Sequence, residues 1–174
     1  DTTVELIWGE MVAKMPTLLH AKIAARLLIK LGAFVMEHCL GDVMTEANYH
    51  LPNDPHNDRV PDVSFIRADR NLPTIEQGSA PFMPDLAVEV KSEGNTYKEL
   101  REKANYFLRG GAKLVWLVYP QRREVEVCTL NAGGGLTIQT VSGDDATLNG
   151  GDVVPNFTLA LKDIFTPVPP ASPP

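Results

Sequence analysis

Two apolar runs separated by a helical segment constrain the fold of this chain most. Residues 84 to 91 read PDLAVEVK, a β-rich run with acids placed inside it. Residues 96 to 108 carry apolar side chains at helical spacing, and Gly110 and Gly111 end that pattern. The next run, LVWLVY, is apolar throughout and predicts a strand. This strand, helix and strand order, in a chain of 174 residues, fits one α/β or α+β domain.

The segments before this unit predict a hairpin, a long helix and two more strands. VELIWGEMVAKM (residues 4 to 15) alternates like a hairpin with its turn near Gly9. Pro16 and Thr17 then introduce a helix that ends before Gly41. Strands are predicted at 43 to 51 and 60 to 66, around the polar loop PNDPHND. A second loop, DRNLPTIEQGSAPFMP (residues 69 to 84), is predicted to be irregular surface chain. The apolar residues that recur at helical spacing in the long helix are Leu19, Ile23, Leu27, Leu31 and Val35.

The segments after this unit predict more strands and a tail. EVEVCTL (residues 124 to 130) alternates acids with apolar residues, so it is expected to pair with LVWLVY as an antiparallel hairpin. Gly133 to Gly135 read as a hairpin connection to the strand LTIQTV rather than as a phosphate-binding loop. We expect a single domain over residues 1–166 and a Pro-rich disordered tail over residues 167–174.

Composition excludes some classes of protein and argues against others. No run approaches the roughly 18 apolar residues of a spanning helix, and no export signal is visible, so we expect a cytoplasmic protein with no membrane partner. Cys39 and Cys128 lack metal-ligand spacing and are predicted to be reduced, buried thiols. The net charge of −6 argues against a generally basic nucleic-acid surface, although a local basic rim is compatible with it.

Two acids inside apolar strands are the strongest indication of chemistry. Asp62 lies in RVPDVSFI and Glu89 lies in LAVEVK. Because side chains alternate along a strand, Glu89 and Lys91 are expected to share one face of theirs. A buried carboxylate is costly without compensation, and a divalent cation with oxygen ligands compensates it well. The same residues also allow an alternative to a metal site, which is an ordinary ion pair between an acid and a lysine on a sheet face.

A third acid would complete such a site. Glu46 lies near a predicted strand start and could bind the metal through water or orient the attacking water. Magnesium, or manganese in its place, suits a set of two carboxylates and several waters. Lys91 would then lie beside the nucleophilic water or the scissile phosphate, where its charge offsets the developing negative charge.

The spacing of Pro61-Asp62 and Glu89-Val90-Lys91 resembles the PD-(D/E)XK nuclease superfamily. Within it, the chain resembles the Uma-type family of putative restriction endonucleases over nearly its whole length. The resemblance implies a restriction-endonuclease-like α/β core with a mixed sheet flanked by helices, preceded by the N-terminal hairpin and long helix. It also implies a divalent-metal site at Asp62 and Glu89, Lys91 as the catalytic lysine, and Glu46 as a further acid. The segments that match in order are ELIWGEMV, Pro16 to His20, LGDVMTE, RVPDVSFI, PDLAVEVKS, KANYFLRGGAKLVWLVYP and REVEV.

Several further residues allow two interpretations each. Lys103 either faces the site, as the resemblance implies, where it would contact phosphate or a carboxylate, or is a solvated helix lysine. His20 either approaches the cleft or caps and packs its helix. Asp85 is assigned to a strand start and Tyr106 to core packing. Ser92 and Asn95 are expected to cap the following helix, with Thr96 as the alternative.

Two functions follow from these observations. The first is a metal-dependent endonuclease acting on nucleic acid, with DNA expected from the family resemblance alone, and working as a homodimer because two strands need two active sites. The second is a catalytically silent nuclease-fold module for binding or assembly, which the acidic balance favours.

Overall fold

A mixed sheet of six strands, ordered β10-β9-β8-β7-β6-β3, forms the centre of the protein. The computed structural model describes residues 4–13, 16–70 and 78–167. Within the sheet, β7 and β8 are parallel and the other neighbours are antiparallel, which confirms the predicted mixed sheet. Its strands are β3 (Gly41–Thr45), β6 (Val63–Arg67), β7 (Leu86–Val90), β8 (Leu114–Tyr119), β9 (Glu124–Leu130) and β10 (Leu136–Ser142).

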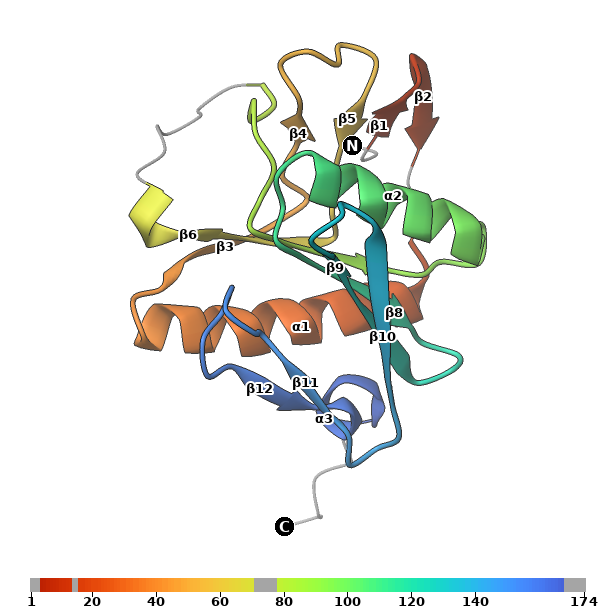
Figure 1. Cartoon of the computed structure of the whole chain (residues 1–174). Coiled ribbons are helices and arrows are strands. Elements are labelled where there is room, and N and C mark those ends of the chain that lie inside the picture. The colour runs from red at the N-terminus through yellow and green to blue at the C-terminus, as the bar shows by residue number, and fades with distance from the viewer. Residues whose placement is uncertain (1–3, 14–15, 71–77, 168–174) are drawn as a thin grey trace.

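Two helices pack against opposite faces of this sheet (Figure 1). The helix α1 (Leu18–Glu37) packs against the face that carries Val88 and Trp116. The helix α2 (Tyr97–Arg109) connects β7 to β8 and packs against the face that carries Ala87 and Leu117. The predicted strand, helix and strand unit is thus a crossover between parallel strands, and both faces of β7 and β8 are buried as such strands require.

The helix α1 confirms the predicted long helix, with one correction to its buried side. Thr17 caps it, its side chain accepting the N–H of His20. Ile23 and the apolar residues after it at spacings of four are buried, whereas Leu19 is 46% exposed and His20 takes the inner position. Four residues exceed one helical turn of 3.6 residues, so a spacing of four drifts around the helix and leaves Leu19 at the edge of the buried side.

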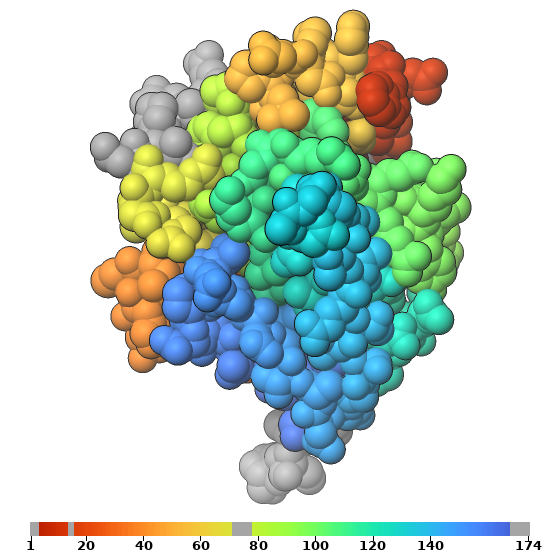
Figure 2. Space-filling model, viewed as in Figure 1, coloured from red at the N-terminus to blue at the C-terminus, as the bar shows by residue number. Residues whose placement is uncertain are grey.

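The N-terminal hairpin belongs to a second sheet of four short strands, ordered β2-β1-β5-β4. Trp8 and Gly9 form its turn with φ values of 53° and 84°, as the sequence predicted near Gly9. The Gly9 N–H also donates to the His56 carbonyl, and Figure 2 shows the red hairpin beside the gold segment around that loop. The strands are β1 (Val4–Ile7), β2 (Glu10–Ala13), β4 (Tyr49–His50) and β5 (Asp58–Arg59).

The two strands predicted between the long helix and the second loop differ from the observed strands. The one predicted at 43–51 is broken at Glu46, whose φ is 51°, so that β3 stays in the large sheet and β4 joins the small one. The one predicted at 60–66 is observed as β6 but begins three residues later, at Val63. Proline has no N–H for a ladder bond, which accounts for the start after Pro61.

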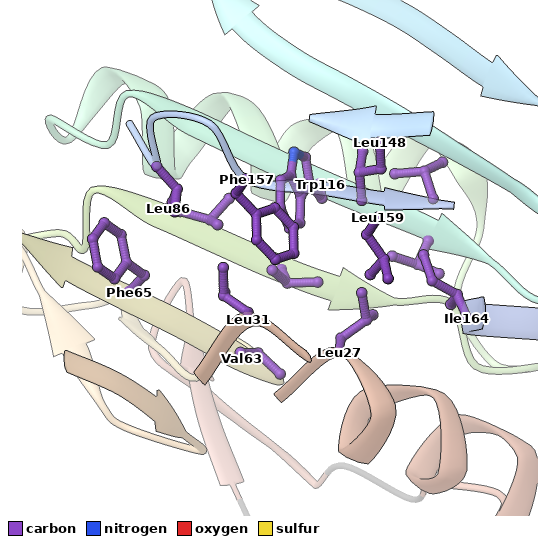
Figure 3. Packing of buried hydrophobic residues seen from close by; sticks show 14 of the residues in the cluster. Leu27, Leu31, Val63, Phe65, Leu86, Trp116, Leu148, Phe157, Leu159 and Ile164 are labelled. Atoms are coloured by element: carbon purple, nitrogen blue, oxygen red, sulfur yellow. The ribbon is translucent and has the colours of Figure 1, made fainter. Parts of the chain in front are cut away.

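The C-terminal part covers the α1 side of the core (Figure 3). The antiparallel β8-β9 hairpin and the β9-β10 connection at Gly133–Gly135 are as predicted. Phe157 stacks on Trp116 with ring centroids 6.0 Å apart. The elements here are β11 (Thr147–Asn149), β12 (Thr158–Ala160) and α3 (Leu161–Phe165).

The remaining predictions concern the second loop, the tail, the cysteines and membrane crossing. A short 3₁₀ helix η1 (Ala68–Arg70) follows β6, while residues 71–77 of the predicted loop and 168–174 of the predicted tail lie outside the described residues. Cys128 is buried as predicted, but Cys39 is exposed just after α1, so that part of the prediction was wrong. Across the described ranges, no helix has the length and apolar character needed to cross a membrane.

Candidate active site

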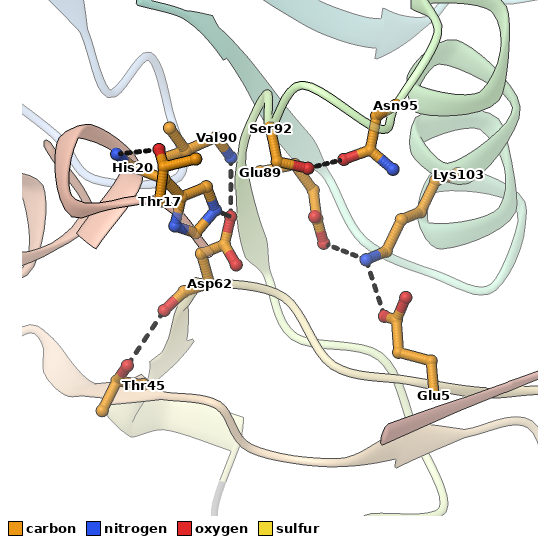
Figure 4. Close-up of polar contacts among 10 residues, drawn as sticks. All are labelled: Glu5, Thr17, His20, Thr45, Asp62, Glu89, Val90, Ser92, Asn95 and Lys103. Atoms are coloured by element: carbon orange, nitrogen blue, oxygen red, sulfur yellow. Dashed lines mark hydrogen bonds and ion pairs between the residues drawn. The ribbon is translucent and has the colours of Figure 1, made fainter. Parts of the chain in front are cut away.

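Asp62 lies where the chain enters β6, one residue after Pro61. Its N–H donates to the Val88 carbonyl at 3.0 Å, and its Oδ2 accepts the Val90 N–H at 2.7 Å. The same Oδ2 lies 3.0 Å from Nε2 of His20, at the start of α1. Asp62 is only 5% exposed, so these contacts fix its carboxylate at the end of the sheet (Figure 4).

Glu89 is the neighbour of Asp62 across the two strands. Val63 pairs with Val88, so Asp62 and Glu89 are the next positions along β6 and β7. Val88 and Val90 face α1, whereas Glu89 faces α2 as its alternation with them requires. The Glu89 carboxylate is buried and lies 2.7 Å from the Lys103 ammonium (Figure 4). The structure therefore brings the two predicted acids to adjacent strand ends.

Lys103 lies between two buried carboxylates rather than in solvent. Its Nζ is 2.7 Å from Oε1 of Glu89 and 2.6 Å from Oε1 of Glu5, in β1. The same Glu5 oxygen accepts the Val60 N–H at 2.7 Å, two residues before Asp62. The contact with a carboxylate is one of the two arrangements expected for Lys103, and the solvated alternative was wrong because the side chain is 11% exposed.

Sequence reasoning missed Glu5 as a site residue. The acid was visible only as a polar position in the alternating hairpin run VELI. A glutamate inside a hairpin is usually solvated, and nothing near it in the sequence indicates its partner. The available signal was its place between Val4 and Leu6 in a strand, which does not say what packs over that strand.

Lys91 follows β7 and turns toward α2. Its Nζ donates to the Ser92 carbonyl at 3.0 Å and lies 5.6 Å from the centroid of the Tyr97 ring. Arg122 lies 5.2 Å from the centroid of the same ring, so two cations approach one aromatic side chain. Glu89, two residues before Lys91, pairs with Lys103 of α2.

Glu46 lies on the α1 side of Asp62. It lines a shallow hollow of about 200 Å³ together with His20 and Asp62, and it is exposed. The walls of the hollow are otherwise mostly small or apolar, including Ala21 and Ala25. Over the part of the chain that the structure describes, no three His, Cys, Asp or Glu side chains gather in a way that could hold a metal ion. The roles predicted for Glu46, Asp62, Glu89, Lys91 and Lys103 at a metal site stay predictions.

The secondary candidates take structural positions. The His20 ring hydrogen-bonds the Asp62 carboxylate, so His20 approaches the site as one of its two interpretations expected. Asp85 precedes β7 and accepts the Arg67 N–H, which agrees with a strand-start role. Burial raises the pKa of Tyr106 to about 12, and Arg59 lies 5.0 Å from the centroid of its ring.

The cap of α2 is Thr96, not the expected Ser92 or Asn95. Thr96 and Glu99 bond reciprocally as a capping box. Ser92 instead donates to the Asn95 side chain at 2.6 Å. The alternative assignment to Thr96 is therefore confirmed.

A further buried carboxylate lies on the α2 side of the sheet. Glu126, in β9, accepts hydrogen bonds from Arg101 and from the Tyr119 hydroxyl, the latter at 2.9 Å. Burial would raise the pKa of Glu126, but the bonds from Arg101 and Tyr119 outweigh it and the pKa is lowered. These partners make Glu126 a structural group with its charge satisfied.

Comparison with known proteins agrees with this fold. A crystal structure of a putative nuclease belonging to DUF820, from Anabaena variabilis, matches with a TM-score of 0.78 and 21% sequence identity, over 93% of this chain and 89% of that chain. No curated protein matches. The sequence model of the Uma2 family, described as "Putative restriction endonuclease", matches residues 1–162. The expected restriction-endonuclease-like fold is confirmed, and the chain belongs to the Uma2 family of putative restriction endonucleases.

Proposed function

We propose that the protein is a metal-dependent endonuclease that hydrolyses phosphodiester bonds, with DNA as the substrate. Membership of the Uma2 family supports nuclease function in general. The observation that carries the finer proposal is the placement of Asp62 and Glu89 at neighbouring strand ends. Both carboxylates are buried at adjacent strand ends, and the amide of Val90, next to Glu89, binds Asp62 directly.

The donor set fits a magnesium or manganese ion. Magnesium keeps most of its waters in proteins and needs only one or two carboxylates. Asp62 and Glu89 would hold the ion, with Glu46 reaching it through water from the hollow that it shares with Asp62. The bound ion would polarise the phosphate and lower the pKa of a water molecule.

The remaining side chains orient these carboxylates and supply positive charge. His20 holds Oδ2 of Asp62 from the α1 side, and Lys103 holds Glu89 from the α2 side. Lys91, half-buried beside Tyr97, offers an ammonium close to the strand end where a phosphate would lie. A positive group at that position favours the negative charge that develops in the transition state.

A cleavage assay with a charge-only variant tests this proposal. Asp62→Asn keeps an oxygen that can accept the Val90 N–H and removes the negative charge. We expect cleavage of plasmid DNA by the wild type with magnesium or manganese, loss of cleavage with a chelator, and a fall of at least about a hundredfold in the variant. Asp42→Asn is the matched control because Asp42 is an exposed acid in β3. Undiminished cleavage by Asp62→Asn would remove the assignment.

The same assay addresses the polymer and the oligomeric state. RNA of matched length replaces the plasmid to compare the two nucleic acids. We also propose a homodimer, because a restriction-like enzyme needs two active sites to cut two strands. Sedimentation at cleavage concentrations measures the mass, and a monomer that still cuts both strands would contradict the dimer.

A silent binding or assembly module is the second candidate, and two observations favour it. The Lys103 ammonium already lies against Glu89 and the His20 ring already hydrogen-bonds Asp62, so both carboxylates have partners without a metal. The exposed Trp8 and Met11 of the hairpin also offer an apolar surface. Calorimetric titration with manganese separates the two functions, since tight binding that Asp62→Asn abolishes supports the nuclease.

A further inference from the structure

The buried trio of Glu5, Lys103 and Glu89 joins three distant parts of the chain. Glu5 comes from the N-terminal hairpin, Glu89 from the central sheet and Lys103 from α2. Glu5 is 5% exposed and Glu89 is 3% exposed, so neither carboxylate has much access to water. The Lys103 ammonium lies 2.6 Å from the Glu5 carboxylate and 2.7 Å from the Glu89 carboxylate. Figure 4 shows it between the two.

The trio has two acids for one ammonium. Two buried carboxylates that share one counter-cation favour the arrival of a further cation. A divalent ion on Glu89 and the Lys103 ammonium are like charges competing for the same carboxylate. Lys103 is therefore an obstacle to metal binding unless another group holds it.

Glu5 has the position of such a group. Its Oε1 contacts the ammonium and is fixed by the Val60 N–H, so it stays in place whatever Glu89 binds. We propose that Lys103 is an internal counter-cation that competes with the divalent ion at Glu89, and that Glu5 is the positioning residue that holds Lys103 when the ion binds. This inference rests on the proposed metal site and adds Glu5 and a competing cation to it.

Two variants move metal affinity in opposite directions. Lys103→Met keeps the packed stem of the side chain and removes the competing charge, so manganese should bind about tenfold more tightly or better. Glu5→Gln keeps an acceptor for the Val60 N–H and removes the charge that shares Lys103. The ammonium is then left to Glu89 alone, and manganese should bind about tenfold more weakly.

The double variant separates this role from a direct charge effect. If Glu5 acts through Lys103, Glu5→Gln has little effect on manganese affinity once Lys103→Met is present. If Glu5 attracts the ion only by its own charge, the loss is the same in both backgrounds. Equal losses would overturn the role of Glu5. The controls are Lys98→Met on the exposed side of α2 and Glu10→Gln in the same hairpin.

Calorimetry with manganese alone and thermal unfolding with and without manganese give the readouts, and neither needs nuclease activity. In chelator, the melting temperature of Lys103→Met should be below that of the wild type, because two buried acids lose their counter-charge. Manganese should raise the melting temperature of this variant more than that of the wild type. If Lys103→Met binds manganese no better than the wild type, including the case where neither binds, the competition is overturned. Failure of the cleavage assay alone, with these affinity changes found, would reject the nuclease and leave this inference standing.

Discussion

The Oδ2 atom of Asp62 accepts the backbone N–H of Val90, the residue between Glu89 and Lys91, at 2.7 Å. This bond joins the two halves of the sequence pattern, and the two bonded residues are 28 positions apart in the chain. It also completes the sheet, since the regular pairing of β6 and β7 stops at Val63 and Val88. Asp62 therefore has a structural task besides any chemical one.

Asp62→Ala should lower stability while Asp62→Asn largely preserves it. The alanine leaves the buried Val90 N–H without its acceptor, which costs about 1–3 kcal/mol of unfolding free energy. The asparagine keeps an oxygen acceptor. Urea denaturation measures both, with the exposed Asp42→Ala as control. Equal stability of the alanine and asparagine variants would show that the bond contributes little.

Glu126 should make the stability of the fold depend on pH. Its folded pKa is lowered from the ordinary 4.5, so the deprotonated group stabilises the fold above that value and loses this contribution as pH falls through the lowered pKa. The wild type should exceed Glu126→Gln in melting temperature at neutral pH, and the gap should narrow below 4.5. Glu102→Gln, an exposed acid of α2, serves as control. A gap that is constant with pH would contradict the charged role.

The two cysteines should differ in reactivity. Cys39 is exposed, whereas burial raises the pKa of the Cys128 thiol to about 12, with Glu126 adding to the shift. A thiol reagent should label the native protein at Cys39 and label Cys128 only in denaturant. Mass spectrometry of the wild type and Cys39→Ser counts the labels. Rapid labelling of native Cys39→Ser would refute the prediction.

Alanine should have opposite effects at two glycines. Gly41 has φ of 151°, and a Cβ there would come within 2.0 Å of the Ile66 carbonyl, so Gly41→Ala should cost more than about 2 kcal/mol. Gly32 lies inside α1 with open space at its Cβ position, so Gly32→Ala should add about 0.5–1 kcal/mol. Urea denaturation of both variants checks the signs. A Gly41→Ala protein as stable as the wild type would show that β3 shifts without cost.

Local patterns predicted the elements that are regular along the chain. The alternation in LAVEVK predicted that Glu89 lies opposite Val88 and Val90, and the spacing of Ile23, Leu27 and Leu31 predicted the inner side of α1. The family resemblance added the sheet type. The faces of a strand and of a helix depend on residues that are close together in the sequence, so a periodic pattern predicts them.

The contacts that complete the site depend on tertiary folding. Lys103 reaches Glu5 because the small sheet lies against α2, and no periodicity in either segment records that contact. The break at Glu46 was missed because β3 and β4 pair in different sheets, which the alternating run from Val43 to Leu51 does not reveal. Lys91 approaches Tyr97 at the start of α2 because β7 has already ended at Val90.

The two tryptophans occupy opposite environments. Trp8 is 77% exposed at the hairpin turn, and Trp116 is fully buried against Phe157. The two side chains should therefore differ in fluorescence. Trp8 should emit at longer wavelength and be accessible to quenchers, whereas Trp116 should emit at shorter wavelength. With the other indole replaced by phenylalanine, each becomes a separate optical probe, one for events near Glu5 and one for loss of the central sheet.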